Sequence, residues 1–404
     1  MKKWLQVGLG IVTSIGGYLD AGSFATAVQA GAAFRFQLLW TLLFGTLCMV
    51  GLIEMAGRLA AVSKHSLRDA LHERFGFPFS FLVLCIGVLL DFLVLASEIG
   101  GVCLAVQLAT GISFRWWALP VAFVTWLLLW KGTFGIIQNG VSVLGLVTLA
   151  FLVAVFRTGI PWHQAAAGLL PSLPVNDPAH YWFITVSILG ATISPYMIWF
   201  YSSGAIEDRW DESYLGANRA ISVIGMGFGS SISMAILIVS ALVLHPAGIR
   251  VDRYEQGALI LTGTFPHWGF LFFTASLAIA SFGAALQVAL TLAYSVAQVF
   301  GWTWGEDKPP RESGRFALVY TAAIFLSSLL IVAGVEPLRL TVLTMALVAA
   351  SLPLVAVPLL LLMNDREYVG KHTNNWFGNA LVIVVIAFAF VLAIVAVPLQ
   401  ILGS

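Results

Sequence analysis

The stretch GGYLDAGSFATA, residues 16–27, places a carboxylate, Asp20, among three glycines within a long apolar segment. Glycine in a helix interior costs up to about 1 kcal/mol relative to alanine, so several together indicate that a helix is unwound there. Unwound backbone at membrane depth is tolerated only where it lines a cavity. The carbonyl oxygens freed in this way, together with the carboxylate, would form a hard site for a cation.

A second stretch of the same kind is GATISPYMIWFYSSG, residues 190–204. Pro195 has no amide hydrogen and clashes with the preceding turn, so carbonyls near Ala191 are expected to lose their helical partners. The two stretches fall in the first and the sixth apolar runs of the chain. Broken helices five spans apart are typical of an inverted repeat of five plus five helices, with the substrate site at the bilayer midplane where the breaks meet.

The composition places the whole chain in a membrane. Of its 404 residues, 60% are hydrophobic and 10% are charged, and the mean hydropathy is +0.95, whereas about a quarter of the residues of a soluble domain are charged. The apolar runs are close to the ~20 residues that cross the bilayer as a helix, and are too uniform for barrel strands. The sequence therefore predicts an all-α integral membrane protein with eleven transmembrane helices, at about 8–32, 36–62, 79–109, 115–131, 134–156, 180–203, 218–244, 267–300, 316–334, 340–363 and 375–402.

The distribution of basic residues predicts the orientation. With the N-terminus inside, most of the 20 Lys and Arg residues, including Lys2, Lys3 and Arg68, fall on the cytoplasmic side, as the positive-inside rule requires. An odd number of spans then places the C-terminus outside, and we expect a multi-pass protein of the plasma membrane. The net charge of +1 predicts no nucleic-acid partner.

Four acidic residues lie inside predicted spans, where a charge costs roughly 2.5 to 3.5 kcal/mol and marks a functional candidate. Glu54 precedes Arg58 by four residues, which predicts a structural ion pair on one helix face. Asp91 and Glu98 are seven residues apart and share a face. They predict either a proton path or an interior polar network. Asp20 is predicted to be a ligand.

At the two broken stretches the chain resembles the natural resistance-associated macrophage protein (NRAMP) family of divalent-metal transporters. The family's first helix carries Asp-Pro-Gly-Asn, and the sixth carries Met-Pro-His. The corresponding residues are Asp20-Ala21-Gly22-Ser23 and Ser194-Pro195-Tyr196. The resemblance continues in residues 57–75, 97–111 and 350–362, and so extends over nearly the whole chain.

The resemblance implies a LeuT-like fold, with residues 1–158 as the first five-helix repeat, 159–364 as the second, inverted repeat and 365–404 as the eleventh helix. It also implies a metal site. Its ligands are Asp20, the carbonyl of Ala191, Ser23 in place of the family's Asn and Ser194 in place of its Met. The helix breaks and the pocket are expected to involve Ala21, Gly22, Pro195, Tyr196 and, from the tenth helix, Met345.

The departures from the family pattern favour a harder ion. A thioether selects transition metals, whereas hydroxyl, carboxylate, carbonyl and water oxygens suit Mg²⁺, Ca²⁺ and Mn²⁺. We therefore expect a secondary transporter of Mg²⁺ or Mn²⁺, or both, that works by alternating access. Proton coupling is expected to be weak or absent, because Tyr196 replaces the family's sixth-helix histidine and Leu95 replaces one of an acidic pair in the third helix.

Other functions are less consistent with the sequence. A small organic amine or zwitterion is the alternative substrate, because Ser23, Ser194 and Tyr196 could hydrogen-bond it, although Asp20 would repel an anion. An intramembrane enzyme would need paired catalytic groups, and only Asp20 and Glu98 form a plausible deep pair. We expect no enzymatic activity, no cofactor beyond the transported metal and a transport unit of one chain.

Overall fold

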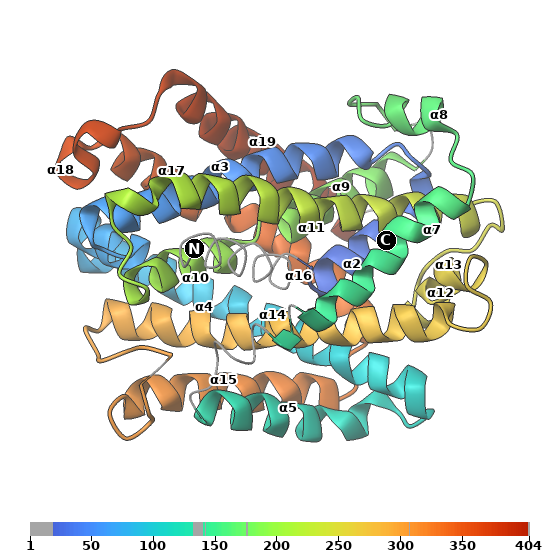
Figure 1. Ribbon diagram of the computed structural model, residues 1–404, viewed down its shortest axis with the longest axis horizontal. Helices are drawn as coiled ribbons and strands as arrows, with labels where there is room; N and C mark the ends of the chain where they lie inside the picture. The colour runs from blue at the N-terminus through green and yellow to red at the C-terminus, as the bar shows by residue number, and fades with distance from the viewer. Residues whose placement is uncertain (1–18, 132–139, 142, 175–176, 307, 403–404) are drawn as a thin grey trace.

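The computed structural model describes residues 19–131, 140–141, 143–174, 177–306 and 308–402, and the side chains up to residue 390. Within these residues the chain is helical and contains no strand (Figure 1). Gly16, Gly17, Lys2 and Lys3, which the predictions above use, lie outside the described residues.

The helices of the first half follow the predicted runs. They are α2 (Ala21–Phe34), α3 (Leu39–Ser63), α4 (Leu67–Thr110), α5 (Phe114–Trp130) and α7 (Leu149–Arg157), which follows a short 3₁₀ turn, η1 (Gly145–Thr148). A six-residue helix, α8 (Trp162–Ala167), lies in the connection to the second half.

The second half contains the longer helices α11 (Leu215–Val243), α14 (Gly269–Val299) and α15 (Gly314–Val332), and two pairs that lie end to end. These pairs are α9 (Pro178–Thr192) with α10 (Pro195–Glu207), and α16 (Pro337–Ser351) with α17 (Pro353–Asn364). The short segments are η2 (Glu212–Tyr214), α12 (Tyr254–Gly257), α13 (Leu259–Thr262), α18 (Arg366–Val369) and η3 (Gly370–His372), and the last helix is α19 (Trp376–Leu402).

Seven of the described segments are long and apolar enough to cross a membrane, and three shorter apolar helices accompany them. Together with α2, these segments coincide with the eleven predicted runs. The first run begins before the described residues, and the fifth is described only in part. The helix count therefore agrees with the prediction.

Both predicted breaks are present. α2 begins at Ala21, with Asp20 as an extended N-cap residue (φ −135°, ψ 176°). α9 ends at Thr192, and α10 begins at Pro195. A third interruption, at Gly76 (φ 78°), divides α4 into a short first part and a long apolar second part. This positive φ suits glycine, which has no Cβ to clash.

Helices of the first half (α2 to α7) pack against helices of the second half (α9 to α17), so the two halves do not form separate domains. α4 packs mainly on α14, α2 on α11, and α9 on α16. Figure 1 shows α14 lying along α4, with α5 and α15 forming an outer pair. The halves therefore meet along α2, α4, α9, α10 and α16, which are the helices that hold the predicted site residues.

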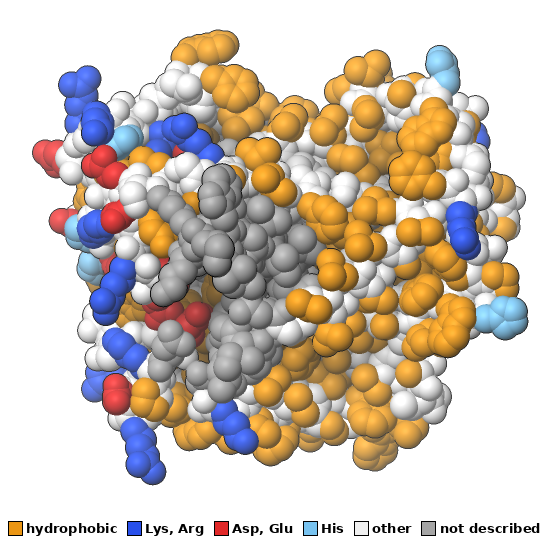
Figure 2. Space-filling model, in the orientation of Figure 1, with side chains coloured by type: hydrophobic (Ala, Val, Ile, Leu, Met, Phe, Trp, Pro, Cys, Tyr) orange, Lys and Arg blue, Asp and Glu red, His pale blue; other side chains and the backbone are white. Residues whose placement is uncertain are grey.

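The surface separates into a charged end and an apolar band. Figure 2 shows most of the visible Lys, Arg, Asp and Glu side chains gathered at the end where α18 lies, and many hydrophobic side chains over the described part of the remaining face. At the charged end, Arg74 pairs with Asp365 at 3.2 Å and Lys371 with Glu212 at 3.4 Å. The predicted pair of Glu54 and Arg58 is confirmed at 3.1 Å.

Candidate metal-binding site

Asp20 lies at the start of α2 and is buried, with 1% of its surface exposed. Its Oδ1 accepts the backbone N–H of Ser23 at 2.6 Å, the usual role of an N-cap carboxylate, and the Ser23 hydroxyl lies beside the same carboxylate. Its Oδ2 is buried and has no hydrogen-bond partner in the described part of the chain. One oxygen therefore holds the helix start, and the other is left for a ligand.

Glu98, on α4, forms the opposite wall of this break. Its Oε2 accepts the backbone N–H of Ala21 at 3.0 Å, while its Oε1 is buried and has no described partner. The hydroxyl of Tyr254, on α12, donates to the carbonyl of Ala21 at 3.0 Å. The first residue of α2 is thus held from both sides, and two buried carboxylates lie next to each other across it.

The second break turns at Ile193 and Ser194, both outside the helical region. The Ser194 hydroxyl donates to the carbonyl of Ala191 at 3.0 Å and, more weakly, to that of Gly190 at 3.4 Å. As expected, Pro195 offers the Ala191 carbonyl no helical N–H, and the Ser194 hydroxyl takes the place of that partner. A serine directly before the proline supplies the donor that Pro195 lacks, and the carbonyl oxygen keeps a second lone pair for another ligand.

Met345 of α16 lies between the two breaks. A Cβ placed on Gly22 would lie 2.7 Å from the Met345 sulfur, and one placed on Gly190 would lie 1.8 Å from the Met345 carbonyl oxygen. The absence of a side chain at both glycines lets α2 and α9 approach α16 this closely. Met345, a predicted pocket residue, is thus in contact with both halves of the site.

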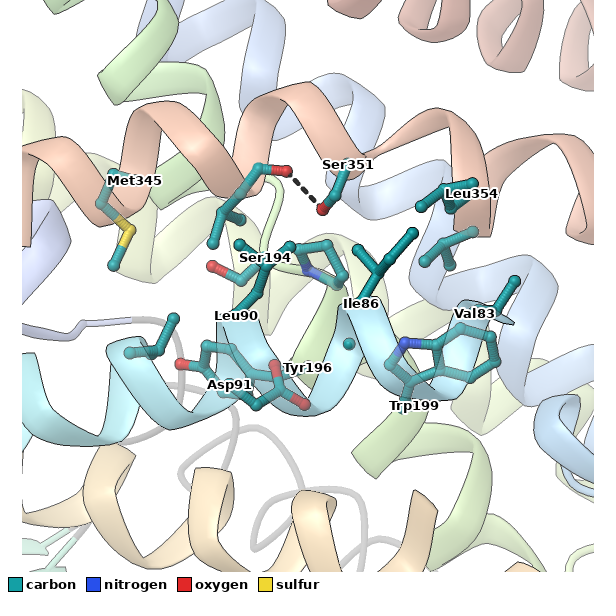
Figure 3. Close-up of a pocket in the computed structure, with 15 residues that line it drawn as sticks. Val83, Ile86, Leu90, Asp91, Ser194, Tyr196, Trp199, Met345, Ser351 and Leu354 are labelled. Atoms are coloured by element: carbon teal, nitrogen blue, oxygen red, sulfur yellow. Dashed lines mark hydrogen bonds between the residues drawn. The ribbon is translucent and has the colours of Figure 1, made fainter. Parts of the chain in front are cut away.

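A pocket begins at this point and continues between α4, α10, α16 and α17 (Figure 3). Ser194, Pro195, Tyr196 and Met345 are among its lining residues, and Asp91 lies beside Tyr196. Its free volume is about 20 Å³, room for about one water molecule. In this conformation the site is therefore nearly closed.

Asp91 and Glu98 do not form one cluster. Glu98 lies at the first break, whereas Asp91 lies two helical turns away and faces the pocket. The charges of both carboxylates act on the Tyr196 hydroxyl, and the charge of Asp20 acts on it more strongly. Tyr196 therefore lies near all three buried carboxylates.

Apart from the Met345 sulfur, which packs against Gly22, the donor atoms at the two breaks are hard oxygens. Within the described residues, no group of three or more His, Cys, Asp or Glu side chains is arranged to hold a metal ion. The atoms offered are instead carboxylate oxygens of Asp20 and Glu98, a serine hydroxyl and the carbonyls at the second break. Such a set suits a hard cation bound loosely enough to be released.

Comparison with known proteins agrees with the geometry. A sequence model of the family described as natural resistance-associated macrophage protein-like matches residues 10–398. The chain belongs to this family. Membership places it among the NRAMP divalent-metal transporters, multi-pass proteins of the membrane, and confirms the family that the two broken stretches predicted.

Solved NRAMP and other transporter structures share the fold. A manganese transporter of Eremococcus coleocola, crystallised as a substitution variant, superposes with a TM-score of 0.80 at 19% identity, covering 98% of this chain and 87% of that one. Mhp1, a nucleobase-cation-symport-1 family transporter, gives 0.66 at 13% identity, covering 97% and 91%. MhsT, in complex with L-phenylalanine, gives 0.62 at 17% identity, covering 97% and 98%. The predicted LeuT-like fold is confirmed.

Two residues of this NRAMP chain were missed by sequence reasoning. Tyr254 lies between predicted spans and gave no signal. Arg68 was assigned to a cytoplasmic loop, but it is 2% exposed and belongs to the first turn of α4. The reason for this error is the interruption at Gly76, which turns the start of α4 back into the protein.

Proposed function

We propose that this chain is a secondary transporter of a hard divalent cation, Mg²⁺ or Mn²⁺ or both, that works by alternating access. The observation that carries the proposal is the buried Asp20 carboxylate at the first break, which has Glu98 beside it. Oδ2 of Asp20 and Oε1 of Glu98 have no described partner, and no described Lys, Arg or His forms an ion pair with either residue. Buried uncompensated charge is strongly unfavourable, so a transported cation would supply the missing compensation.

The nature of the donors supports a hard ion. The ligands proposed are the Asp20 carboxylate, the Ser23 and Ser194 hydroxyls and the Ala191 carbonyl. Met345 lies close by, but it packs its sulfur against Gly22, inside the contact between α2 and α16. Without a thioether at residue 194, the site would favour oxygen-loving cations, and the manganese transporter of the same fold provides a precedent for one of the two ions.

The arrangement of the breaks supports alternating access. We propose residues 1–158 and 159–364 as the two inverted repeats, with residues 365–404 as an additional helix. The half-helices α2 and α10 would tilt about the turns at Asp20 and Ser194, because these turns contain the interruptions in the two helices. Movement of the repeats about a fixed site is the usual mechanism of such transporters.

We also propose that transport is not coupled to stoichiometric protons. None of the seven histidines is buried, so none of them can relay a proton through the membrane interior. Glu98 hydrogen-bonds to the backbone of α2, which gives it a structural role beside the cation. The membrane potential, worth about 2.3 kcal/mol per charge per 100 mV, would drive a divalent ion inward without protons.

The charged end of the molecule supports the proposed orientation. Basic residues gather at the end that contains α18, which is expected to be cytoplasmic by the positive-inside rule. This orientation puts the N-terminus inside and the C-terminus outside, in a plasma membrane, with one chain as the transport unit.

The test is uptake into proteoliposomes loaded with a metal-sensitive dye, with Mg²⁺, Mn²⁺ or Ca²⁺ outside. Wild-type protein should take up Mg²⁺ and Mn²⁺, and Asp20→Ala should lower the initial rate by about tenfold or more, a loss of at least ~1.4 kcal/mol. Glu367→Gln, which removes an exposed carboxylate, is the matched control and should transport normally.

Two results would overturn parts of the proposal. Absence of uptake of any cation, with binding of a small amine or amino acid that survives Asp20→Ala, would favour the organic substrate instead. Acidification of the liposome lumen in proportion to metal uptake would contradict uncoupled transport while leaving the metal site intact.

A further inference from the structure

Arg68 is a buried cation at the far end of the pocket that begins at the candidate site. It lies in the first turn of α4, before the interruption at Gly76. Its Cζ is 3.9 Å from the centre of the Trp199 ring, and its Nη2 donates to the hydroxyl of Ser295 on α14 at 3.1 Å. Its Nε and Nη1 are buried and have no described partner. The side chain therefore keeps its charge with few hydrogen bonds.

The guanidinium is directed toward the pocket wall. A Cβ placed on Gly87 would lie 3.7 Å from the Arg68 Nη2, and both Gly87 and Trp199 line the pocket. Asp91 follows Gly87 by four residues, one turn along the same face of α4. The guanidinium therefore lies about one helical turn from Asp91, whose charge, together with that of Asp69, favours the charged form of Arg68.

Asp91 is the natural counterpart of this cation. It is 5% exposed, faces the pocket and has no hydrogen bond within the described part of the chain. Among the described residues, Arg68 is the charged group that favours the ionised form of Asp91. Figure 3 shows Asp91 on the same side of the pocket as Tyr196, between Met345 at one end and Trp199 at the other.

The order of side chains along the pocket indicates a role for Arg68 and Asp91 in the passage of the ion. A cation that leaves Ser194 and Met345 through the pocket passes Asp91 first and then reaches Trp199 and Arg68. We propose that Arg68 is a tethered cation that neutralises Asp91 in the empty pocket and gives way to the divalent ion as it passes. The proposal rests on the proposed function, because it assigns Arg68 a role in the route of the same ion.

Electrostatics explains why such a device would help transport. Asp91 alone would be a second buried carboxylate on the route and would hold a divalent ion there, slowing release. With Arg68 in place, an ion at Asp91 is repelled by the guanidinium, so it passes without remaining. A divalent ion is attracted to Asp91 twice as strongly as the singly charged guanidinium at the same distance, so it can displace Arg68 from Asp91, whereas a monovalent ion has no such advantage. Arg68 is therefore a specificity-determining residue in this proposal.

The first experiment counts bound metal by isothermal titration calorimetry with Mn²⁺ on the purified full chain in detergent. We expect one Mn²⁺ per chain for the wild type, two for Arg68→Met, and one again for Arg68→Met combined with Asp91→Asn. Arg68→Lys, which keeps the charge, should bind one. Arg315→Met is the matched control, because Arg315 is also stacked on a tryptophan, Trp302, but at the surface, and it should bind one.

The second experiment measures Mn²⁺ release from preloaded proteoliposomes, and its first arm, Asp91→Asn alone, applies even where Arg68→Met folds poorly. Asp91→Asn leaves the Arg68 charge uncompensated in the route, and should slow Mn²⁺ flux about tenfold, whereas addition of Arg68→Met to it should restore the flux. A purely structural Arg68 would instead make the double variant worse than either single one.

The outcomes separate the two proposals. If the wild type binds and transports no metal, the proposed function fails. If the wild type binds one Mn²⁺ through Asp20 and a folded Arg68→Met variant also binds only one, Arg68 is not a tethered cation. The same conclusion follows if Arg68→Lys behaves as Arg68→Met. In both cases the proposed function as a metal transporter is unaffected.

Discussion

The side chain of Met345 occupies the space that a side chain at residue 22 would need. A Cβ on Gly22 would lie 2.7 Å from the Met345 sulfur and 2.8 Å from its terminal methyl carbon, closer than real Cβ contacts allow. Packing against Met345 therefore favours glycine at residue 22, two residues after Asp20, in addition to the break in the helix. The two broken stretches and α16 fit together through this contact.

Gly22→Ala should lower stability only while Met345 is present. In the wild-type background the added methyl displaces the end of the Met345 side chain, an overpacking that costs about 1 to 3 kcal/mol. In the background of Met345→Ala the clash is gone, and alanine is preferred to glycine within a helix by up to about 1 kcal/mol. The change should then be neutral or stabilising, as measured by thermal unfolding in detergent. An equal loss in both backgrounds would contradict the packing account.

Gly190→Ala should have a more severe effect than Gly22→Ala. The added methyl would lie 1.8 Å from the backbone oxygen of Met345, and no rotamer change can move a backbone atom away. We expect little monodisperse protein by size-exclusion chromatography. Gly204→Ala in α10 is the matched control, because a Cβ there has no neighbour within 4 Å, and it should keep or raise the thermal midpoint. A well-folded Gly190→Ala variant with wild-type stability would show that α9 and α16 can separate at no cost.

The breaks could be predicted because their signals are local. Asp20 with its glycines and Pro195 act within one helical turn, and the pair of Glu54 and Arg58 depends only on helical spacing. The burial of Arg68 could not be predicted, because its partner Ser295 is 227 residues away in the sequence. Its position also depends on the turn at Gly76, and a single glycine within a long apolar run does not specify the direction of that turn.

The residues of the site could be predicted only in part, because some of their contacts depend on segments that are distant in the sequence. Local sequence indicated an unwound sixth helix, but it did not show that the Ser194 hydroxyl would reach back to Ala191, which depends on the rotamer that the closed pocket selects. Nor did the sequence show which of the two acids, Glu98 or Asp91, contacts the start of α2. Both share one face of α4, and only the position of α2 against that face determines which of them meets Ala21.

Glu98 should tolerate replacement by glutamine but not by alanine. Glu98→Gln keeps an oxygen that can accept the Ala21 N–H, whereas Glu98→Ala leaves a buried donor unpaired, which costs about 1 to 3 kcal/mol. We expect Mn²⁺ uptake of Glu98→Gln to stay within about threefold of the wild type, and that of Glu98→Ala to fall about tenfold, in line with a loss of ~1.4 kcal/mol. Equal loss in both variants would show that the negative charge, rather than the hydrogen bond, is required.

Ser194→Met should shift ion preference toward softer metals. The substitution places a thioether at the second break, and thioethers favour transition metals over Mg²⁺. We expect the ratio of Cd²⁺ to Mg²⁺ uptake to rise about tenfold, equivalent to ~1.4 kcal/mol of relative binding free energy, chiefly through loss of Mg²⁺ transport. Competition between the two ions in dye-loaded proteoliposomes measures this ratio directly.

Ser194→Ala provides the control for that substitution. It removes the hydroxyl without adding a sulfur, so it should weaken uptake of both ions and leave their ratio near the wild-type value. A similar shift in both variants would assign selectivity to the loss of the hydroxyl alone. An unchanged ratio in Ser194→Met, with transport retained, would show that the ion does not contact residue 194, and the proposed ligand set would then reduce to Asp20, Ser23 and the backbone carbonyls of α9.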